Sequence, residues 1–502
     1  MTNKEKIARL KELIAEIKIY SHVIGKISFD MSCCAPKDGM AQAGDEMSEL
    51  GKTPFRISHS DEYVTLLKEL HADSSGLDPY ETRMIHNLMR SYKRTCNQTP
   101  EFAFEKDKTM NSSYPVWLEA KKASDFGMFR DSLKANIAIS KEALDLRTDR
   151  KGTYYEDCFD DFEPGSTVED LEQFFGALKA EIPALIKKIK EEGKPVRKDF
   201  LTRPVAIPLQ EKMSRQVLTM EGLNWDRLVF MTTEHPFTTS FGVKDVRVTT
   251  HYYEDKFFSN IFSTLHEGGH ALFMQRLHSE ITDNYLSDGM TLAQHECMSR
   301  FFENIIGRSE AFVHALYPLI QETCGDQFAD VSEREFYEAI NRAEPGLIRM
   351  EADELTYPMH ILIRYELEKG FMNGDITVDE LPGLWVQKYK EYLGVDVPDD
   401  ARGVLQDMHW TSDYGYFPTY ALGSAYGAQI IKAMEKDFDV FGEVAKGHLT
   451  PVADWLEEKA FQCACVLDPK EWMEKVTGEP FNVQYFIDYL KEKYSKIYGI
   501  EL

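Results

Sequence analysis

Apolar residues recur at helical spacing along most of this chain. Near the N-terminus Ile7, Leu10, Ile14, Ile17 and Ile24 follow one another at intervals that match a helix, with Lys and Glu between them. Such a stripe predicts a long helix with one buried face. Comparable patterns predict further helices over residues 60–96, 126–146, 185–192, 335–341 and 357–369, and from residue 423 to the end. The chain is therefore expected to be mainly α-helical.

Polar or proline-containing stretches interrupt these predicted helices. Residues 28–51 contain proline and glycine and are expected to form an irregular crossing, and the Asp- and Tyr-rich residues 149–166 a surface turn. Thr167 is a suitable helix N-cap, because the acidic Asp170 follows three positions later. Pro183 lacks a backbone donor and is expected to kink or restart the helix that follows.

One apolar, proline-free run, residues 257–277, carries a chemical motif, His266-Glu267-Gly268-Gly269-His270. Residues four apart in a helix lie on one face, so His266 and His270 can present ring nitrogens to one tetrahedral metal ion. Glu267 then lies beside the open coordination position, where a carboxylate can take a proton from water. The spacing predicts two zinc ligands and a general base.

An alternative to the metal site is a core helix whose histidines are incidental. The two glycines inside the motif argue against it. Each of Gly268 and Gly269 costs about 1 kcal/mol relative to Ala in a helix interior. A purely structural helix has no reason to accept both. The close approach of a metal or of another backbone would supply that reason, which favours the metal site.

A catalytic zinc site needs a third protein ligand and an open position. The best candidate is Glu296, which begins a second helical pattern after the polar residues 279–289. His295 and Cys297 are competing ligands, but neighbours in a helix point about 100° apart, so only one of the three faces the site. A carboxylate leaves zinc more Lewis-acidic than a thiolate would, which favours Glu296 for hydrolysis.

The pattern changes from helical to strand-like near Pro204 and does so again about 40 residues later. Residues 205–209 and 244–253 are rich in β-branched and aromatic side chains, and Val246, Val248 and Thr250 alternate with other residues. A small antiparallel sheet is expected just before the metal-binding helix. Its edge could bind an extended peptide by backbone pairing, or the sheet could be purely structural.

Two later segments contain candidate substrate-binding groups. The charged residues 349–354 are flanked by apolar runs, so part of this cluster should be buried, and Arg349 is suited to binding both oxygens of a carboxylate. Residues 403–420 combine hydrogen-bonding aromatics with Gly and Pro turns. Such a segment is better suited to a pocket wall that offers donors to a peptide carbonyl than to a core.

The amino-acid composition of the chain argues against some classes of binding partner. The formal net charge of −26 over 502 residues argues against nucleic acids and anionic membranes. No apolar run is long enough to span a membrane and the N-terminus opens into an amphipathic helix, which predicts a cytoplasmic protein.

The eight cysteines lack framework spacing and are expected to be free thiols. With no repeat or linker, residues 1–502 are expected to form one catalytic unit of two lobes.

The chain resembles the M32 metallocarboxypeptidases, most densely over residues 235–429. The motifs that carry the resemblance are, in order, His235-Pro236-Phe237, Asp245-Val246-Arg247-Val248-Thr249, His266-Glu267-Gly268-Gly269-His270, His295-Glu296, Ile348-Arg349-Met350-Glu351-Ala352-Asp353 and Gly403-Val404-Leu405-Gln406-Asp407-Met408-His409-Trp410. The resemblance implies a mainly helical, neurolysin-like (gluzincin) fold with a deep groove between two lobes. It also implies a homodimer that removes single C-terminal residues from peptides.

Carried over position by position, the resemblance assigns roles to single residues. His266, His270 and Glu296 would bind one Zn²⁺ per subunit, for which cobalt could substitute, and Glu267 would be the general base and acid. Arg349 would receive the terminal carboxylate of the substrate. The remaining assignments are His409 and Tyr420 as catalytic groups that steady the tetrahedral intermediate or position the terminal residue, and His235 and Arg247 as substrate-binding groups.

The chain departs from the family pattern in two places. Where relatives have H-E-S/G-Q, this chain has Cys297 and Met298 after Glu296, which preserves the ligand but changes its neighbours. Where relatives often have W-D-x-E-T, it has Phe29-Asp30-Met31-Ser32-Cys33. Substrate preference therefore does not carry over from the relatives.

The expected function is that of a zinc carboxypeptidase acting on peptides with a free C-terminus. One alternative is an oligopeptide endopeptidase with the same zinc chemistry, which would not depend on Arg349. Another is a non-catalytic peptide-binding protein that retains a metal site. The presence of Glu267 argues against that last alternative, because a structural zinc ion has no use for a base.

Overall fold

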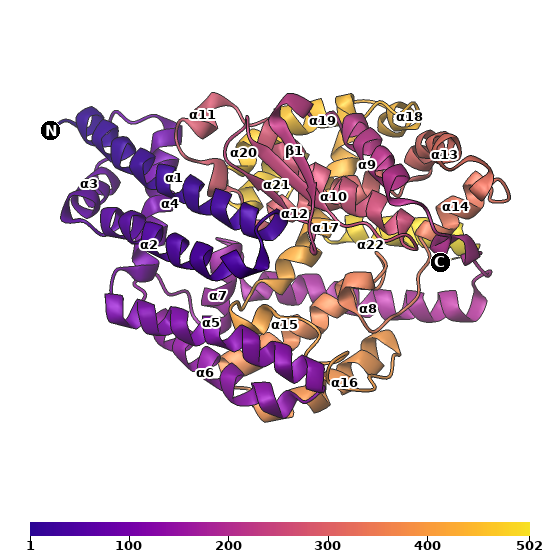
Figure 1. The fold of residues 1–502 in the computed structure, drawn as a ribbon, viewed down its shortest axis with the longest axis horizontal. Helices are drawn as coiled ribbons and strands as arrows, with labels where there is room; N and C mark the ends of the chain where they lie inside the picture. The colour runs from indigo at the N-terminus through magenta and orange to yellow at the C-terminus, as the bar shows by residue number, and fades with distance from the viewer. Residues whose placement is uncertain (502) are drawn as a thin grey trace. The chain divides into compact units, whose positions relative to one another are not determined.

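Two compact units, each assembled from three stretches of chain, make up the structure, a computed structural model that describes residues 1–501 (Figure 1). The first unit comprises Met1–Tyr92, Thr202–Met290 and His448–Val466. The second comprises Lys93–Leu201, Thr291–Gly447 and the described residues from Leu467 on. Both units are predominantly helical, as the spacing of apolar residues predicted.

The first unit contains the only strands among residues 1–501. Its elements are α1 (Asn3–Cys33), α2 (Met40–Ser58), α3 (Asp61–Ala72), α4 (Pro79–Thr95, whose last residues fall in the second unit), α9 (Ile207–Glu221), β1 (Leu228–Thr232), β2 (Thr238–Ser240), β3 (Val246–Thr250), α10 (Phe257–Gln275), α11 (Ser279–Thr282), α19 (Thr450–Leu456) and α20 (Gln462–Ala464). Helix α10 packs against α9 on one side and against β2 and β3 on another. It is therefore enclosed by its own unit.

The second unit is helical throughout. Its elements are α5 (Pro100–Ala123), α6 (Phe126–Asp145), α7 (Tyr154–Phe162), α8 (Val168–Glu192), α12 (Leu292–Arg300), α13 (Glu310–Cys324), α14 (Glu333–Ile340), α15 (Tyr357–Asn373), α16 (Leu381–Leu393), α17 (Phe417–Met434), α18 (Val440–Ala445), α21 (Pro469–Thr477) and α22 (Gln484–Tyr498). A π-helical stretch, Phe301–Ile306, continues α12. The apolar α17 forms the centre of this unit, in contact with α12, α15, α21 and α22.

The sheet is mixed, whereas the alternating pattern predicted an antiparallel one. Central strand β3 pairs parallel with β1 and antiparallel with β2. The predicted strand at 205–209 is wrong, because helix α9 begins at Ile207 with Pro208 in its first turn. Proline is well suited to that position, since its fixed φ matches a helix and its missing N–H has no partner there.

Two other local predictions were also wrong, and a third was wrong in part. Residues 28–51 are largely helical, because α1 runs to Cys33 and α2 begins at Met40. Helix α8 continues through Pro183, with buried apolar residues on both sides of it, so the predicted restart of the helix is wrong. Residues 149–166 contain α7, whose Asp157 is fully buried and bonded to Arg150. Three of its acidic residues, Asp157, Asp160 and Asp161, pair with arginines of the same unit, so a polar composition did not mean a surface turn.

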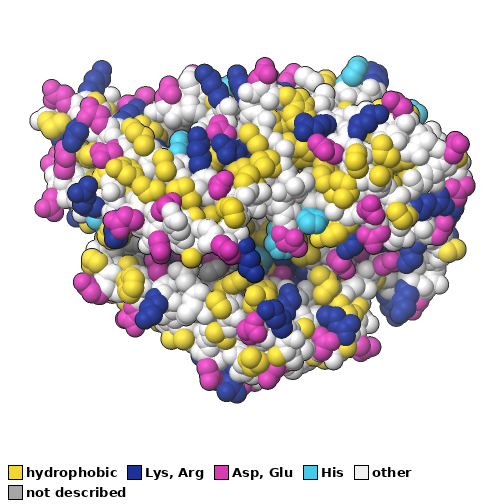
Figure 2. Space-filling view, in the orientation of Figure 1, with side chains coloured by type: hydrophobic (Ala, Val, Ile, Leu, Met, Phe, Trp, Pro, Cys, Tyr) yellow, Lys and Arg dark blue, Asp and Glu magenta, His cyan; other side chains and the backbone are white. Residues whose placement is uncertain are grey.

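Surface and thiol features agree with the composition. Acidic and basic side chains are interspersed over the face seen in Figure 2, and apolar side chains gather there over α1 and α2, where Ile19 is 64% exposed. All eight cysteines are free thiols, as predicted. Every helix among residues 1–501 is too short or too polar to span a lipid bilayer.

Candidate active site

Helix α10 presents the two motif histidines side by side. The rings of His266 and His270 lie with their centroids 5.0 Å apart and nearly perpendicular. Both side chains are half-buried, while most of the remaining helix is fully buried. The helix was predicted from its apolar run, and its one accessible face carries the imidazoles.

A buried side chain of α9 explains one of the paired glycines. A β-carbon at Gly268 would lie 1.8 Å from Oε2 and 2.6 Å from the carboxyl carbon of Glu221. Glu221 is fully buried, and burial raises the pKa of its carboxyl group well above the usual range. The sequence suggested a metal or a backbone as the close neighbour, but at Gly268 the neighbour is a side chain on α9.

Polar side chains hold α9 and α10 in register. Ser214 of α9 donates to Oδ1 of Asn260 (2.9 Å) and accepts from Thr264 Oγ1 (3.2 Å), both on α10. Asn260 in turn donates to Thr250 Oγ1 at the end of β3 (2.8 Å). A directional network of this kind fixes the rotation of α10, and so the direction in which its histidines point.

Glu267 is oriented by strand β2. Thr238 Oγ1 lies 2.6 Å from Glu267 Oε2 and 3.0 Å from the backbone oxygen of the same residue. The Glu267 side chain is buried apart from a small exposed fraction. Thr238 did not stand out in the sequence, because the contact joins residues far apart in the chain.

Glu296 lies on the short helix α12, which is anchored at its N-terminus. Thr291 and Gln294 form a capping box, and the buried Glu163 accepts from Ala293 N (2.6 Å) and Thr291 Oγ1 (3.1 Å). On the opposite side α12 packs tightly on α17, where a β-carbon at Gly423 would lie 2.9 Å from Glu296 Cβ. The helix carrying Glu296 therefore has little freedom to shift.

Close contacts also fix the Glu296 carboxylate itself. Arg300 Nε donates to its Oε1 (2.7 Å), and Ser299 Oγ lies 3.2 Å from its Oε2. Cys297, a competing ligand in the sequence, is fully buried, and burial raises the pKa of its thiol well above the usual range.

The donor set fits a metal ion of the zinc type. His266, His270 and Glu296 each offer one ligand atom, and these atoms lie within 4.8 Å of one another. Two imidazoles and one carboxylate form a set that catalytic zinc accepts, with a fourth position open. His295 and Cys297, the alternatives that the sequence left open, are not part of this group.

Arg349 belongs to a buried network in the second unit. Its Nε and Nη2 donate to Asp407 Oδ1 (3.0 and 2.8 Å) and its Nη1 to the Tyr357 hydroxyl (3.1 Å). Arg364 donates to the other oxygen of Asp407 (2.6 Å). Burial would raise the pKa of Asp407, but Arg364 and Arg349 hold it well below its usual range. Arg349 is thus buried and partnered, as predicted for the cluster at 349–354.

His409 and Tyr420 lie in the same unit and touch each other. His409 Nε2 is 3.3 Å from the Tyr420 hydroxyl, and the Arg349 guanidinium lies 5.1 Å from the Tyr420 ring centre. Burial lowers the pKa of His409 to about 4, with Asp407 opposing the shift, so the imidazole is neutral at neutral pH. Burial raises the pKa of Tyr420 well above its usual range, so it keeps its hydroxyl proton.

The remaining two predicted residues lie at the sheet of the first unit. His235 is exposed in the connection between β1 and β2. Arg247 on β3 pairs with Asp245 (2.8 Å), and its guanidinium lies 4.9 Å from the Phe29 ring centre and 4.8 Å from that of Phe241. Arg247 is therefore already engaged by its own unit.

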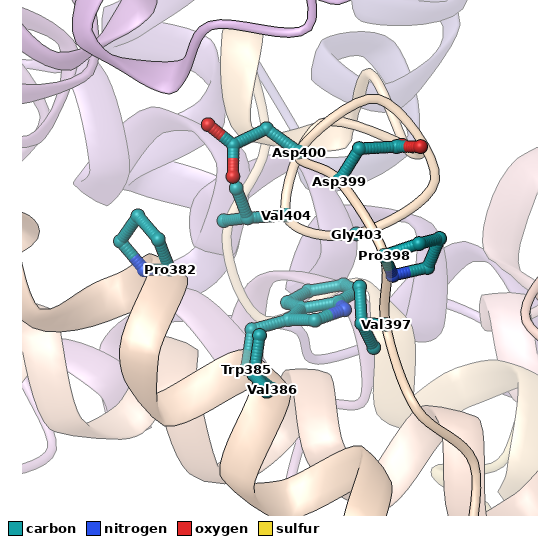
Figure 3. Close-up of a pocket in the computed structure, with 9 residues that line it drawn as sticks. All are labelled: Pro382, Trp385, Val386, Val397, Pro398, Asp399, Asp400, Gly403 and Val404. Carbon is teal, nitrogen blue, oxygen red and sulfur yellow. The ribbon is translucent and has the colours of Figure 1, made fainter.

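A small cavity elsewhere in the second unit contains none of these residues. Its wall (Figure 3) is formed by Pro382, Trp385, Val386, Val397, Pro398, Asp399, Asp400, Gly403 and Val404. The Trp385 ring, which lines this cavity, also lies 4.6 Å from the Arg364 guanidinium. We assign it no part in the chemistry.

Comparison with known proteins covers nearly the whole chain. The family described as carboxypeptidase Taq (M32) metallopeptidase matches residues 9–494. Carboxypeptidase 1 of Bacillus subtilis is 36% identical, over 97% of each chain. The crystal structure of the M32 carboxypeptidase from Deinococcus radiodurans superposes with a TM-score of 0.95 at 30% identity, covering 99% of this chain and 100% of the other. The Pyrococcus furiosus carboxypeptidase structure gives 0.94 at 32% identity, covering 98% and 99%.

Proposed function

The chain belongs to the carboxypeptidase Taq (M32) family and is a metallocarboxypeptidase, and from that premise we propose that its metal is zinc, held by His266, His270 and Glu296. The observation that most supports this is the grouping of their three ligand atoms within 4.8 Å. Zinc in such a site would supply Lewis acidity, which polarises a peptide carbonyl and lowers the pKa of water so that a hydroxide nucleophile is available at neutral pH. Cobalt is the expected functional substitute.

Glu267 is the proposed general base and acid. Its carboxylate takes the proton of the attacking water and later delivers it to the leaving amine. The contact of 2.6 Å with Thr238 Oγ1 supports this role, because it orients Glu267 Oε2.

Arg349 is the proposed receptor for the terminal carboxylate of the peptide. Arg349 and Arg364 share the single carboxylate of Asp407, so among the described residues this buried cluster keeps one positive charge without an acidic partner. Nη1 of Arg349 carries two hydrogens, of which only one is donated to the Tyr357 hydroxyl, and the Nη2 contact to the Met350 sulfur is weak. A substrate carboxylate would neutralise the excess charge.

The neighbouring polar groups complete the proposed substrate contacts. The neutral His409 and the protonated Tyr420 can donate hydrogen bonds to the developing oxyanion or to the terminal residue. Their contact of 3.3 Å supports action as a pair. His235 and Arg247 stay in the proposal as substrate-binding groups, with the Asp245 partner of Arg247 limiting its freedom.

The proposal also covers the organisation of the enzyme. We propose one catalytic unit per chain, a homodimer and a cytoplasmic location, supported by the family resemblance and by the absence of framework cysteines. The oligopeptide endopeptidase alternative is not favoured by the carboxypeptidase relatives.

The decisive experiment follows products by mass spectrometry. An N-terminally blocked peptide is incubated with zinc-loaded protein, with and without chelator, beside the same peptide with an amidated C-terminus. We expect a ladder that shortens by single C-terminal residues, is abolished by chelator and is restored by zinc. Internal fragments, or an equal rate on the amidated peptide, would contradict the assignment of Arg349 as the carboxylate receptor.

A further inference from the structure

Arg300 is the first residue of a chain of contacts that leads away from Glu296. Its Nε donates to Glu296 Oε1 at 2.7 Å, and its Nη1 donates to Glu303 at 3.1 Å. Both glutamates lie within one helical turn of it, so the guanidinium fork is held at two points. Arg300 thereby restricts the Glu296 carboxylate to a single orientation.

Tyr357 supports Arg300 from the other side. The Arg300 guanidinium lies 4.5 Å from the centre of the Tyr357 ring, within the range of a cation–π contact. Tyr357 is the first residue of α15 and is 6% exposed. Its ring therefore forms a rigid surface under the guanidinium.

The same tyrosine contacts Arg349. The Tyr357 hydroxyl accepts from Arg349 Nη1 at 3.1 Å, and its ring lies edge-on to Tyr420 with centroids 6.5 Å apart. Tyr357 thus contacts two cations: its ring face contacts Arg300 and its hydroxyl contacts Arg349. A continuous series, Glu296–Arg300–Tyr357–Arg349, joins the proposed metal ligand to the proposed carboxylate receptor.

We infer that Arg300 and Tyr357 are positioning residues for this reaction, Arg300 for the metal ligand Glu296 and Tyr357 for both arginines. The inference rests on the proposed function. Partners that orient ligands in this way usually change metal affinity about 10- to 100-fold when they are removed. The two residues differ in what they position, so their substitutions affect different measurements.

The test measures zinc affinity by competition with a chromophoric chelator, independently of activity, and then kcat and KM. We expect Arg300→Met to weaken zinc binding about 10- to 100-fold and Arg300→Lys, which keeps a cation, to weaken it less. Tyr357→Phe keeps the ring and loses the hydroxyl. It should leave zinc affinity unchanged and raise KM several-fold for a free-ended peptide, with little change in kcat. Tyr357→Leu, which removes the ring, should both weaken zinc binding and raise KM.

Arg334 supplies a matched control. Its Nε donates to Glu338 four residues later at 2.6 Å, and its guanidinium lies 5.3 Å from the Tyr337 ring centre. Arg334→Met therefore removes an arginine with a comparable pair of contacts, at a more exposed position, and should leave zinc affinity unchanged. Circular dichroism checks the fold of every variant, and Arg300→Lys carries the test if Arg300→Met does not fold.

The outcomes separate this inference from the proposed function. Wild-type zinc affinity in both Arg300→Lys and Arg300→Met would overturn the positioning role of Arg300 and leave the proposed function standing. A Tyr357→Phe variant whose zinc affinity falls by the same factor as its KM rises would do the same for the role of Tyr357. Glu296→Ala is the reference variant. If it binds zinc as tightly as wild type, the ligand assignment fails and the inference fails with it.

Discussion

A carboxyl oxygen of Glu221 occupies the space in which a β-carbon at position 268 would stand. The separation would be 1.8 Å, far inside contact distance, and neither Glu221 oxygen has a hydrogen-bond partner among the described residues. Packing between α9 and α10 therefore requires a glycine at position 268 of the H-E-x-x-H motif, in addition to any requirement of the metal.

The first prediction follows from this contact. Gly268→Ala should destabilise the protein by about 1–3 kcal/mol, since a fully buried side chain cannot swing away. In a Glu221→Ala background the same change should cost less, with a coupling of about 0.5–3 kcal/mol in a denaturation double-mutant cycle.

Gly176 is the control for this cycle. It lies within α8, and a β-carbon there would meet nothing within 4 Å. Gly176→Ala should therefore stabilise the protein by about 0.5–1 kcal/mol, because alanine loses less conformational freedom in a helix. Additive effects of Gly268→Ala and Glu221→Ala would contradict the steric explanation.

The second prediction concerns the general base. Glu267→Gln should lower kcat about 10²- to 10⁴-fold while zinc affinity and the circular dichroism spectrum stay unchanged. Thr238→Val should lower kcat less, because it removes only the group that orients Glu267 Oε2. The assignment would be wrong if Glu267→Gln turned over peptide at the wild-type rate.

The third prediction concerns Arg349. Arg349→Met should lower kcat/KM on a free-ended peptide by the equivalent of about 2–5 kcal/mol of transition-state stabilisation. The reason is that the terminal carboxylate of the substrate loses its buried cationic partner. Residual turnover of the amidated peptide should change little. Equal losses on both peptides would instead indicate a general structural role for Arg349.

The fourth prediction concerns pH and the anchor of α12. Burial raises the pKa of Glu163 to about 8, although Ala293 N–H and the Thr291 hydroxyl oppose the shift. Because the folded pKa is above the unfolded value, the stability that this carboxyl contributes is complete below about pH 4.5. It is lost as the pH rises through about 8.

The measurement is the free energy of unfolding at several pH values between 5 and 9. Glu163→Gln keeps an acceptor for Ala293 N–H but does not titrate. Its unfolding free energy should therefore fall less with rising pH than that of wild type. Parallel pH profiles for the two proteins would show that Glu163 does not carry this dependence.

The sequence predicted best where the signal is local. The helix of His266 and His270 follows from an apolar run with histidines four apart, and Glu296, which ligand chemistry favours over His295 and Cys297, lies near both histidines but stays a prediction as a ligand. Both predictions depend only on near neighbours in the chain. The same holds for the helical character of 335–341 and 357–369, which lie within or overlap α14 and α15.

The sequence failed where distant residues decide the structure. The reason for Gly268 lies on α9, and the partners of Arg349 lie on α15 and at Asp407. Helix α7 was missed because its acidic side chains find arginine partners that composition does not reveal. Thr238 and Tyr357 gave no signal, since a single threonine or tyrosine has no characteristic spacing.

The three-part make-up of each unit sets the order in which the protein can mature during synthesis. The last turn of α10 is tied by Arg276 to Asp454 and Glu457, at 2.7 and 2.8 Å. These partners follow Arg276 by 178 and 181 residues in the sequence, so these contacts of the histidine-bearing helix form only after that much more of the chain has been synthesised. Domains generally fold as units, and here neither unit is complete until the C-terminal segments arrive. A nascent chain stalled before His448 would therefore expose unfinished apolar surface from both units to chaperones and proteases.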